Sequence, residues 1–164
     1  MPNWIDASIA IFFAGAFVLE MKRGFGRAVF DLAALLLALR ITWALGEALS
    51  GSARLAGNGH TNQAILYVTG FLIVGAALVV LGKLVYSTTL VSTDVFEPLL
   101  GGLCGLGIAI IASHVLVQTI ALGVGGDSAP VVIADSVLGT EFLRFDSYHQ
   151  MLELLYNFHR EPVG

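Results

Sequence analysis

The most constraining feature of this 164-residue chain is the stretch from Leu99 to Val124, which contains no Asp, Glu, Lys or Arg over 26 residues. A helix needs about 20 mostly apolar residues to cross the hydrocarbon core of a bilayer. The composition agrees, because 57% of the residues are hydrophobic and only 12% are charged, about half the charged fraction of an average soluble domain. A soluble domain of this size could not bury so much apolar surface. The chain is therefore expected to be an integral membrane protein.

Three further apolar stretches precede this one, and together they predict an all-α transmembrane domain over residues 1–124. The third stretch carries no charge at all. The first two are shorter, and each includes ionisable residues. The expected spans are 4–20, 28–45, 64–82 and 99–124.

The remaining residues, 125–164, are expected to form a tail outside the membrane. The tail opens with Gly, Asp, Ser and Pro residues that are typical of a connector. From about residue 140 to 159, apolar residues recur every three or four positions, which predicts an amphipathic helix. This helix would lie either on the membrane surface or against the spans.

The distribution of basic residues predicts the orientation. Lys22, Arg23 and Arg27 follow the first apolar stretch, whereas no Lys or Arg precedes it. This order argues against a signal peptide, which carries its positive charge before the apolar run. Cytoplasmic loops are enriched in Lys and Arg, so the first connection is expected in the cytoplasm. Four spans then place both termini on the outer side, which in a bacterium is the periplasm.

The first two spans are predicted to form a hairpin that folds back about Arg23-Gly24. Asp6 and Arg40 then lie at one depth, as do Trp4 and Trp43. Two tryptophans at one level are typical of the aromatic belt at a membrane interface. Asp6 and Arg40 could pair across the hairpin, or each could extend into the headgroups.

Asp31 and His114 are further ionisable residues within the spans. Asp31 follows Arg27 by four positions, which favours an ion pair along the helix over a proton or ion site. His114 lies in the middle of the fourth span. It could be a neutral histidine bonded to Gln118 or to a facing helix, or it could be functional, as ionisable groups in membrane spans often are.

The fourth span contains a stripe of small residues at every fourth position: Gly101, Gly105, Ala109 and Ser113. Such a stripe allows another helix to approach closely. The partner helix could come from this chain or from a second copy, so the stripe leaves a homo-oligomer open.

No pattern of reactive residues points to an enzyme. The sequence lacks the H-E-x-x-H, G-x-S-x-G and P-loop motifs, and its single cysteine, Cys104, lies within an apolar span. We therefore predict a non-enzymatic protein without catalytic residues, metal or cofactor. The net charge of −4 also provides no basic surface for nucleic acid.

Two short motifs flank the first span, and together they resemble the colicin V production protein family of bacterial inner membranes. The first includes Trp4 and Asp6, and the second is the run Arg23-Gly24-Phe25. A long span ending at Gly82-Lys83, a glycine-rich span opening at residue 99 and a tail with Ser136 follow in the family's order. The chain departs from the family in lacking a basic residue between the glycines of its last span.

The resemblance implies a multi-pass inner-membrane protein that supports toxin production or export, or envelope function. It brings no catalytic residues. We expect contacts with the lipid bilayer and with a membrane-protein partner or a second copy. The alternative is a subunit of an oligomeric channel or transporter that uses Asp31, His114 and Arg40.

Overall fold

The computed structural model describes residues 3–49, 55–88, 96–125 and 133–144, and these residues form helices and no strand. The helices are α1 (Trp4–Arg23), α2 (Phe25–Leu49), α3 (Gly59–Thr88), α4 (Glu97–Val124) and α6 (Val137–Arg144). The first four are long and apolar enough to cross a membrane, so the protein is an all-α membrane protein as predicted. The tail helix expected at 140–159 lies mostly outside the described residues, and α6 begins three residues before it.

The ends of the first helix are fixed by local hydrogen bonds. The Asn3 side chain caps α1, and the Asp6 carboxylate accepts a hydrogen bond from the Asn3 backbone N–H at 3.0 Å. This reciprocal arrangement satisfies amide groups that the first turn of a helix leaves without partners. Gly24 ends α1 with φ of 85°, a backbone conformation that glycine adopts without strain. The chain then starts α2 at the next residue.

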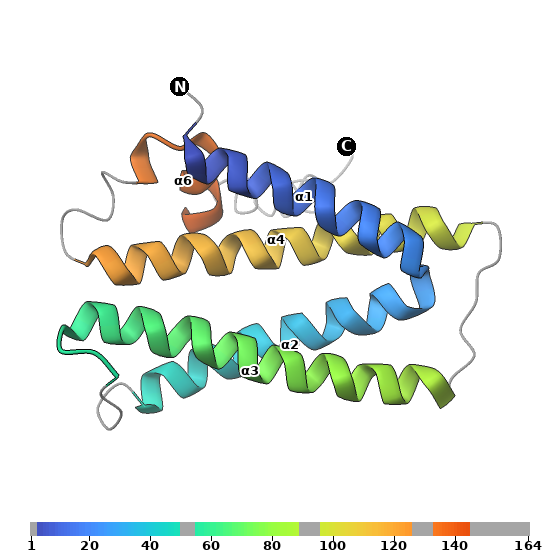
Figure 1. Ribbon diagram of the computed structural model, residues 1–164, viewed down its shortest axis with the longest axis horizontal. Coiled ribbons are helices and arrows are strands. Elements are labelled where there is room, and N and C mark those ends of the chain that lie inside the picture. Colours follow the sequence, from blue (N-terminus) through green and yellow to red (C-terminus); the bar gives the residue numbers. More distant parts are fainter. Residues whose placement is uncertain (1–2, 50–54, 89–95, 126–132, 145–164) are drawn as a thin grey trace, which may run out of the picture.

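The four long helices pair in an order that differs from the order of the chain. Helix α1 packs mainly against α4 and α2 packs mainly against α3, whereas α1 and α2 touch little. Figure 1 shows α1 and α2 diverging from the turn at one end of the bundle. The expected side-by-side hairpin of the first two spans is therefore wrong. The reason is that Gly101 and Gly105 of α4 have no side chain, so the backbone of α1 can approach α4 closely.

Two apolar clusters form the core. One joins the N-terminal half of α1, the C-terminal part of α4 and the tail, and consists of Ile5, Ile9, Val117, Ile133 and Phe142. The other joins α2, α3 and α4 and consists of Ala38, Tyr67, Phe71, Ile111 and Val115. Large apolar side chains on the outer faces of the helices, such as Ile11, Leu37 and Leu72, are exposed, as expected for surfaces that face lipid.

Candidate functional site

The small-residue stripe of α4 lies against α1 within the same chain. A Cβ atom on Gly101 would lie 2.5 Å from the backbone oxygen of Glu20, and one on Gly105 would lie 2.5 Å from that of Ala16. Ala109 and Ser113 are completely buried. The stripe therefore forms an internal helix contact, and a contact between chains would need another surface.

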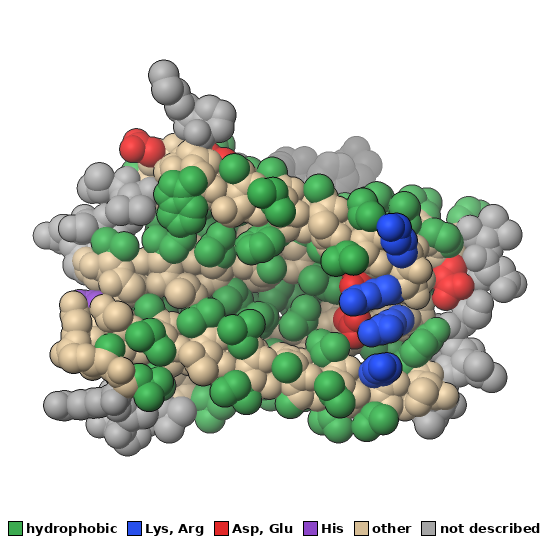
Figure 2. Space-filling model, viewed as in Figure 1, with side chains coloured by type: hydrophobic (Ala, Val, Ile, Leu, Met, Phe, Trp, Pro, Cys, Tyr) green, Lys and Arg blue, Asp and Glu red, His purple; other side chains and the backbone are tan. Residues whose placement is uncertain are grey.

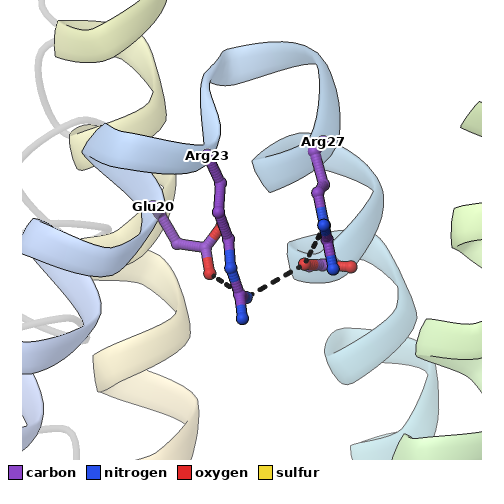
Figure 3. A network of polar contacts seen from close by, with 4 residues as sticks. Glu20, Arg23 and Arg27 are labelled. Atoms are coloured by element: carbon purple, nitrogen blue, oxygen red, sulfur yellow. Dashed lines mark hydrogen bonds and ion pairs between the residues drawn. The ribbon is translucent and has the colours of Figure 1, made fainter.

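A network of charged side chains lies where α1 meets α2 (Figure 3). Arg23 Nη1 lies 2.8 Å from Glu20 Oε1 and 3.7 Å from Asp31 Oδ2. Arg27 Nε lies 3.8 Å from the same Asp31 oxygen. Arg23 thus joins a carboxylate of α1 to a carboxylate of α2 across the turn at Gly24.

The two carboxylates of this network are buried and the two guanidinium groups are not. Glu20 and Asp31 are each 4% exposed, whereas the side chains of Arg23 and Arg27 are 42% and 33% exposed. Buried charges require partners, because transferring an isolated ion out of water costs several kcal/mol or more. The arginines therefore neutralise the carboxylates and at the same time present part of their donor groups to the surroundings. Glu20 Oε2 and Arg27 Nε are buried without a hydrogen-bond partner.

A second polar site holds the tail against the N-terminus of α1. The Asp6 carboxylate accepts hydrogen bonds from the Ser136 hydroxyl at 2.7 Å and from the Leu138 N–H at 2.9 Å, in addition to that from Asn3. Ser136 in turn accepts a hydrogen bond from the Gly139 N–H at 2.8 Å. Asp6 thus connects the first turn of α1 to the first turn of α6.

The expected pairing of Asp6 with Arg40 is not present. The Asp6 carboxylate is directed to the tail, while Arg40 is exposed on α2 and the two helices diverge. Trp4 and Trp43 are both exposed, and the Trp43 ring packs edge-on against Tyr67 at a centroid distance of 6.4 Å.

The other predicted residues have separate positions. Arg27 and Asp31 form the expected pair along α2, and Phe25 begins that helix. His114 lies on α4, away from the charged network, and contacts a facing helix as one alternative had it: its Nδ1 is 3.0 Å from the backbone oxygen of Phe142 in α6.

Sequence reasoning missed two features of these sites. Glu20 was not singled out, although an acidic residue three positions before Arg23 is a recognisable signal for an ion pair. The bond between Asp6 and Ser136 joins residues 130 positions apart, and no local pattern indicates it. Within the described ranges, no group of three or more His, Cys, Asp or Glu side chains could hold a metal ion.

Comparison with protein-family models, with curated proteins and with solved structures found no match. The function is therefore proposed from the motif resemblance together with the residues and their geometry. The two polar sites are the features on which that inference depends: the charged network at the α1–α2 turn and the Asp6 contact with the tail.

Proposed function

We propose that this chain is a non-enzymatic protein of the bacterial inner membrane that supports toxin production or export, or envelope function, through contacts with a partner protein. This is the function that the resemblance to the colicin V production family implies. The motif residues Asp6 and Arg23 make structural contacts here, one with the tail and the other within the charged network.

The docked tail supports this proposal. Asp6 fixes α6 to the start of α1, and the Phe142 side chain of α6 is buried in the apolar core. At the start of α6, by contrast, Val137 is 78% exposed and Leu138 is 38% exposed. An apolar surface held at the end of a membrane bundle is a suitable contact site for a partner protein.

Site-specific photo-cross-linking in cells tests this proposal. A photoreactive amino acid in place of Val137 should give a discrete cross-linked product with the partner. The wild-type chain should restore toxin export or envelope integrity to a strain that lacks it. The matched control is the same amino acid at Leu72, an exposed residue of α3 that is expected to face lipid. No specific product at residue 137, or equal products at both positions, would argue against a partner at the tail.

Thiol labelling tests the proposed orientation, in which both termini are periplasmic. Single cysteines replace Lys22 and Gly57, which are exposed at opposite ends of the bundle, in a Cys104→Ala background. A membrane-impermeant reagent applied to cells with a permeabilised outer membrane should label residue 57 and not residue 22. The reverse pattern would invert the orientation and move the tail to the cytoplasm.

The buried carboxylates support a second candidate function, a subunit of an oligomeric channel or transporter. Ionisable groups within membrane spans often mark the path of an ion or a proton, and Glu20 and Asp31 lie together in this fold. Gly101 of α4 lies against the backbone of Glu20. His114 is 13 positions beyond Gly101 on the same helix, which places it about 20 Å from Glu20 along the helix axis. A continuous path would therefore need additional chains. Ion flux into liposomes that an Asp31→Asn variant loses and a variant of the exposed tail residue Asp135, Asp135→Asn, keeps would favour this function, whereas background leak would exclude it.

A further inference from the structure

Basic side chains from three helices gather at the end of the bundle where α1 meets α2. Lys22 and Arg23 lie in the last turn of α1, Arg27 in the first turn of α2, and Lys83 in the second half of α3. Figure 2 shows Lys and Arg side chains in one column across this end of the molecule. We refer to these four residues as the basic rim.

Packing between α2 and α3 brings Lys83 into the basic rim. A Cβ atom on Gly82 would lie 3.6 Å from Phe30 Cβ, and the ring centroids of Phe30 and Tyr86 are 6.1 Å apart. Arg27 precedes Phe30 by one helical turn, so it lies near the level of Lys83 and Tyr86. The tertiary structure therefore aligns cations that are up to 61 positions apart in the chain.

The basic rim retains positive charge and hydrogen-bond donors. Glu20 and Asp31 offset the two arginines, but Asp31 is 3.7 and 3.8 Å from the guanidinium nitrogens, beyond hydrogen-bond distance, and the side chains of Arg23 and Arg27 are 42% and 33% exposed. Lys22 and Lys83 are exposed and form no ion pair with another described residue. The remaining carboxylate at this turn, Glu97, lies against Gly24.

An apolar surface adjoins the basic rim along the diverging helices. Between α1 and α2 the surface of α4 is covered by Phe17, which lies over Gly102, and by Leu32, which lies over Gly107. Figure 2 shows hydrophobic side chains extending from the column of cations along the length of this face. A ligand that fits both surfaces has an anionic head and long apolar chains.

We propose that the basic rim binds an anionic phospholipid, with the headgroup phosphate at Arg23, Arg27 and Lys83 and the acyl chains along the divergence of α1 and α2. Arginine and lysine are the side chains that bind phosphate, and basic groups between membrane helices are suited to lipid headgroups. Arg40 is an exposed cation in the second half of α2 and lies outside the basic rim.

Electron spin resonance of spin-labelled lipids tests the proposal on the full chain in phosphatidylcholine vesicles. Spin-labelled phosphatidylglycerol should be immobilised more strongly than spin-labelled phosphatidylcholine. Lys83→Gln should weaken the phosphatidylglycerol preference about fivefold, the effect of one cation near an anionic surface, and Lys22→Gln should weaken it less. Arg40→Gln removes the same charge outside the basic rim and should leave the preference unchanged.

Three results would overturn the proposal. One is equal immobilisation of the two lipids by the wild-type chain, and another is an equal loss in Lys83→Gln and Arg40→Gln. The third is displacement of the spin-labelled phosphatidylglycerol by millimolar inorganic phosphate, which would identify a site for free phosphate. Circular dichroism of each variant checks that it is folded. Because Lys22, Lys83 and Arg40 are exposed, we expect each variant to have the helix content of the wild-type chain.

Discussion

Replacing Gly105 by alanine should weaken the packing of α1 on α4. A Cβ atom at this position would lie 2.5 Å from the Ala16 oxygen, 2.9 Å from the Ala16 carbonyl carbon and 3.0 Å from Phe17 Cα. All three atoms belong to the backbone of α1, so no side chain can rotate away to make room. Because ordinary van der Waals contact begins near 3.4 Å, α1 would have to move outward by about 0.9 Å.

The size of this effect follows from general costs of overpacking and from helix propensity. Overpacking a tight contact costs about 1–3 kcal/mol, and the displacement of a whole helix places Gly105→Ala near 3 kcal/mol. Alanine offsets about 1 kcal/mol of that because it favours the helix more than glycine does. The expected net loss is about 2 kcal/mol of unfolding free energy.

Gly15→Ala is the matched control, because a Cβ atom there meets nothing within 4 Å. It should raise the unfolding free energy by up to about 1 kcal/mol through helix propensity alone. Circular dichroism of both variants during unfolding in mixed micelles of a mild detergent and dodecyl sulfate measures the difference, about 3 kcal/mol. Equal stability of the two variants would show that α1 does not approach α4 at Gly105.

Two further substitutions test the polar sites. Asp6→Asn should release the tail, because the carboxylate accepts hydrogen bonds from two of its residues; we expect a loss of about 1.5 kcal/mol for a half-buried charged acceptor. Hydrogen exchange across 133–144 should accelerate about tenfold, whereas the exposed Asp135→Asn should leave it unchanged, and equal rates would refute the contact. Arg27→Gln should destabilise the fold by about 2 kcal/mol, because it removes a neutralising partner of the buried Asp31. Adding Asp31→Asn should recover most of that loss in the same unfolding assay; a purely additive double variant would contradict the pairing.

Hydropathy predicted the membrane-spanning helices because lipid imposes one simple condition, an uncharged segment of sufficient length. The observed helices extend past the predicted spans. For example, α3 runs from Gly59 to Thr88, whereas 64–82 was expected, because polar residues at the ends of a helix can continue it beyond the hydrocarbon core. The pair of Arg27 and Asp31 was also predictable, since residues four apart lie on one face of a helix.

The sequence by itself therefore determined the number of apolar helices, the short-range ion pair and the small-residue stripe of α4, all of which depend on residues close together in the chain. Only the tertiary structure decided which helix covers that stripe, that Asp6 contacts Ser136 rather than Arg40, and that Lys83 joins the basic residues of the α1–α2 turn. The physical reason is that hydropathy is nearly equal on all faces of a lipid-exposed helix and so selects no neighbour. Close backbone approach at Gly101 and Gly105 makes that selection, and it depends on the three-dimensional fit of the helices.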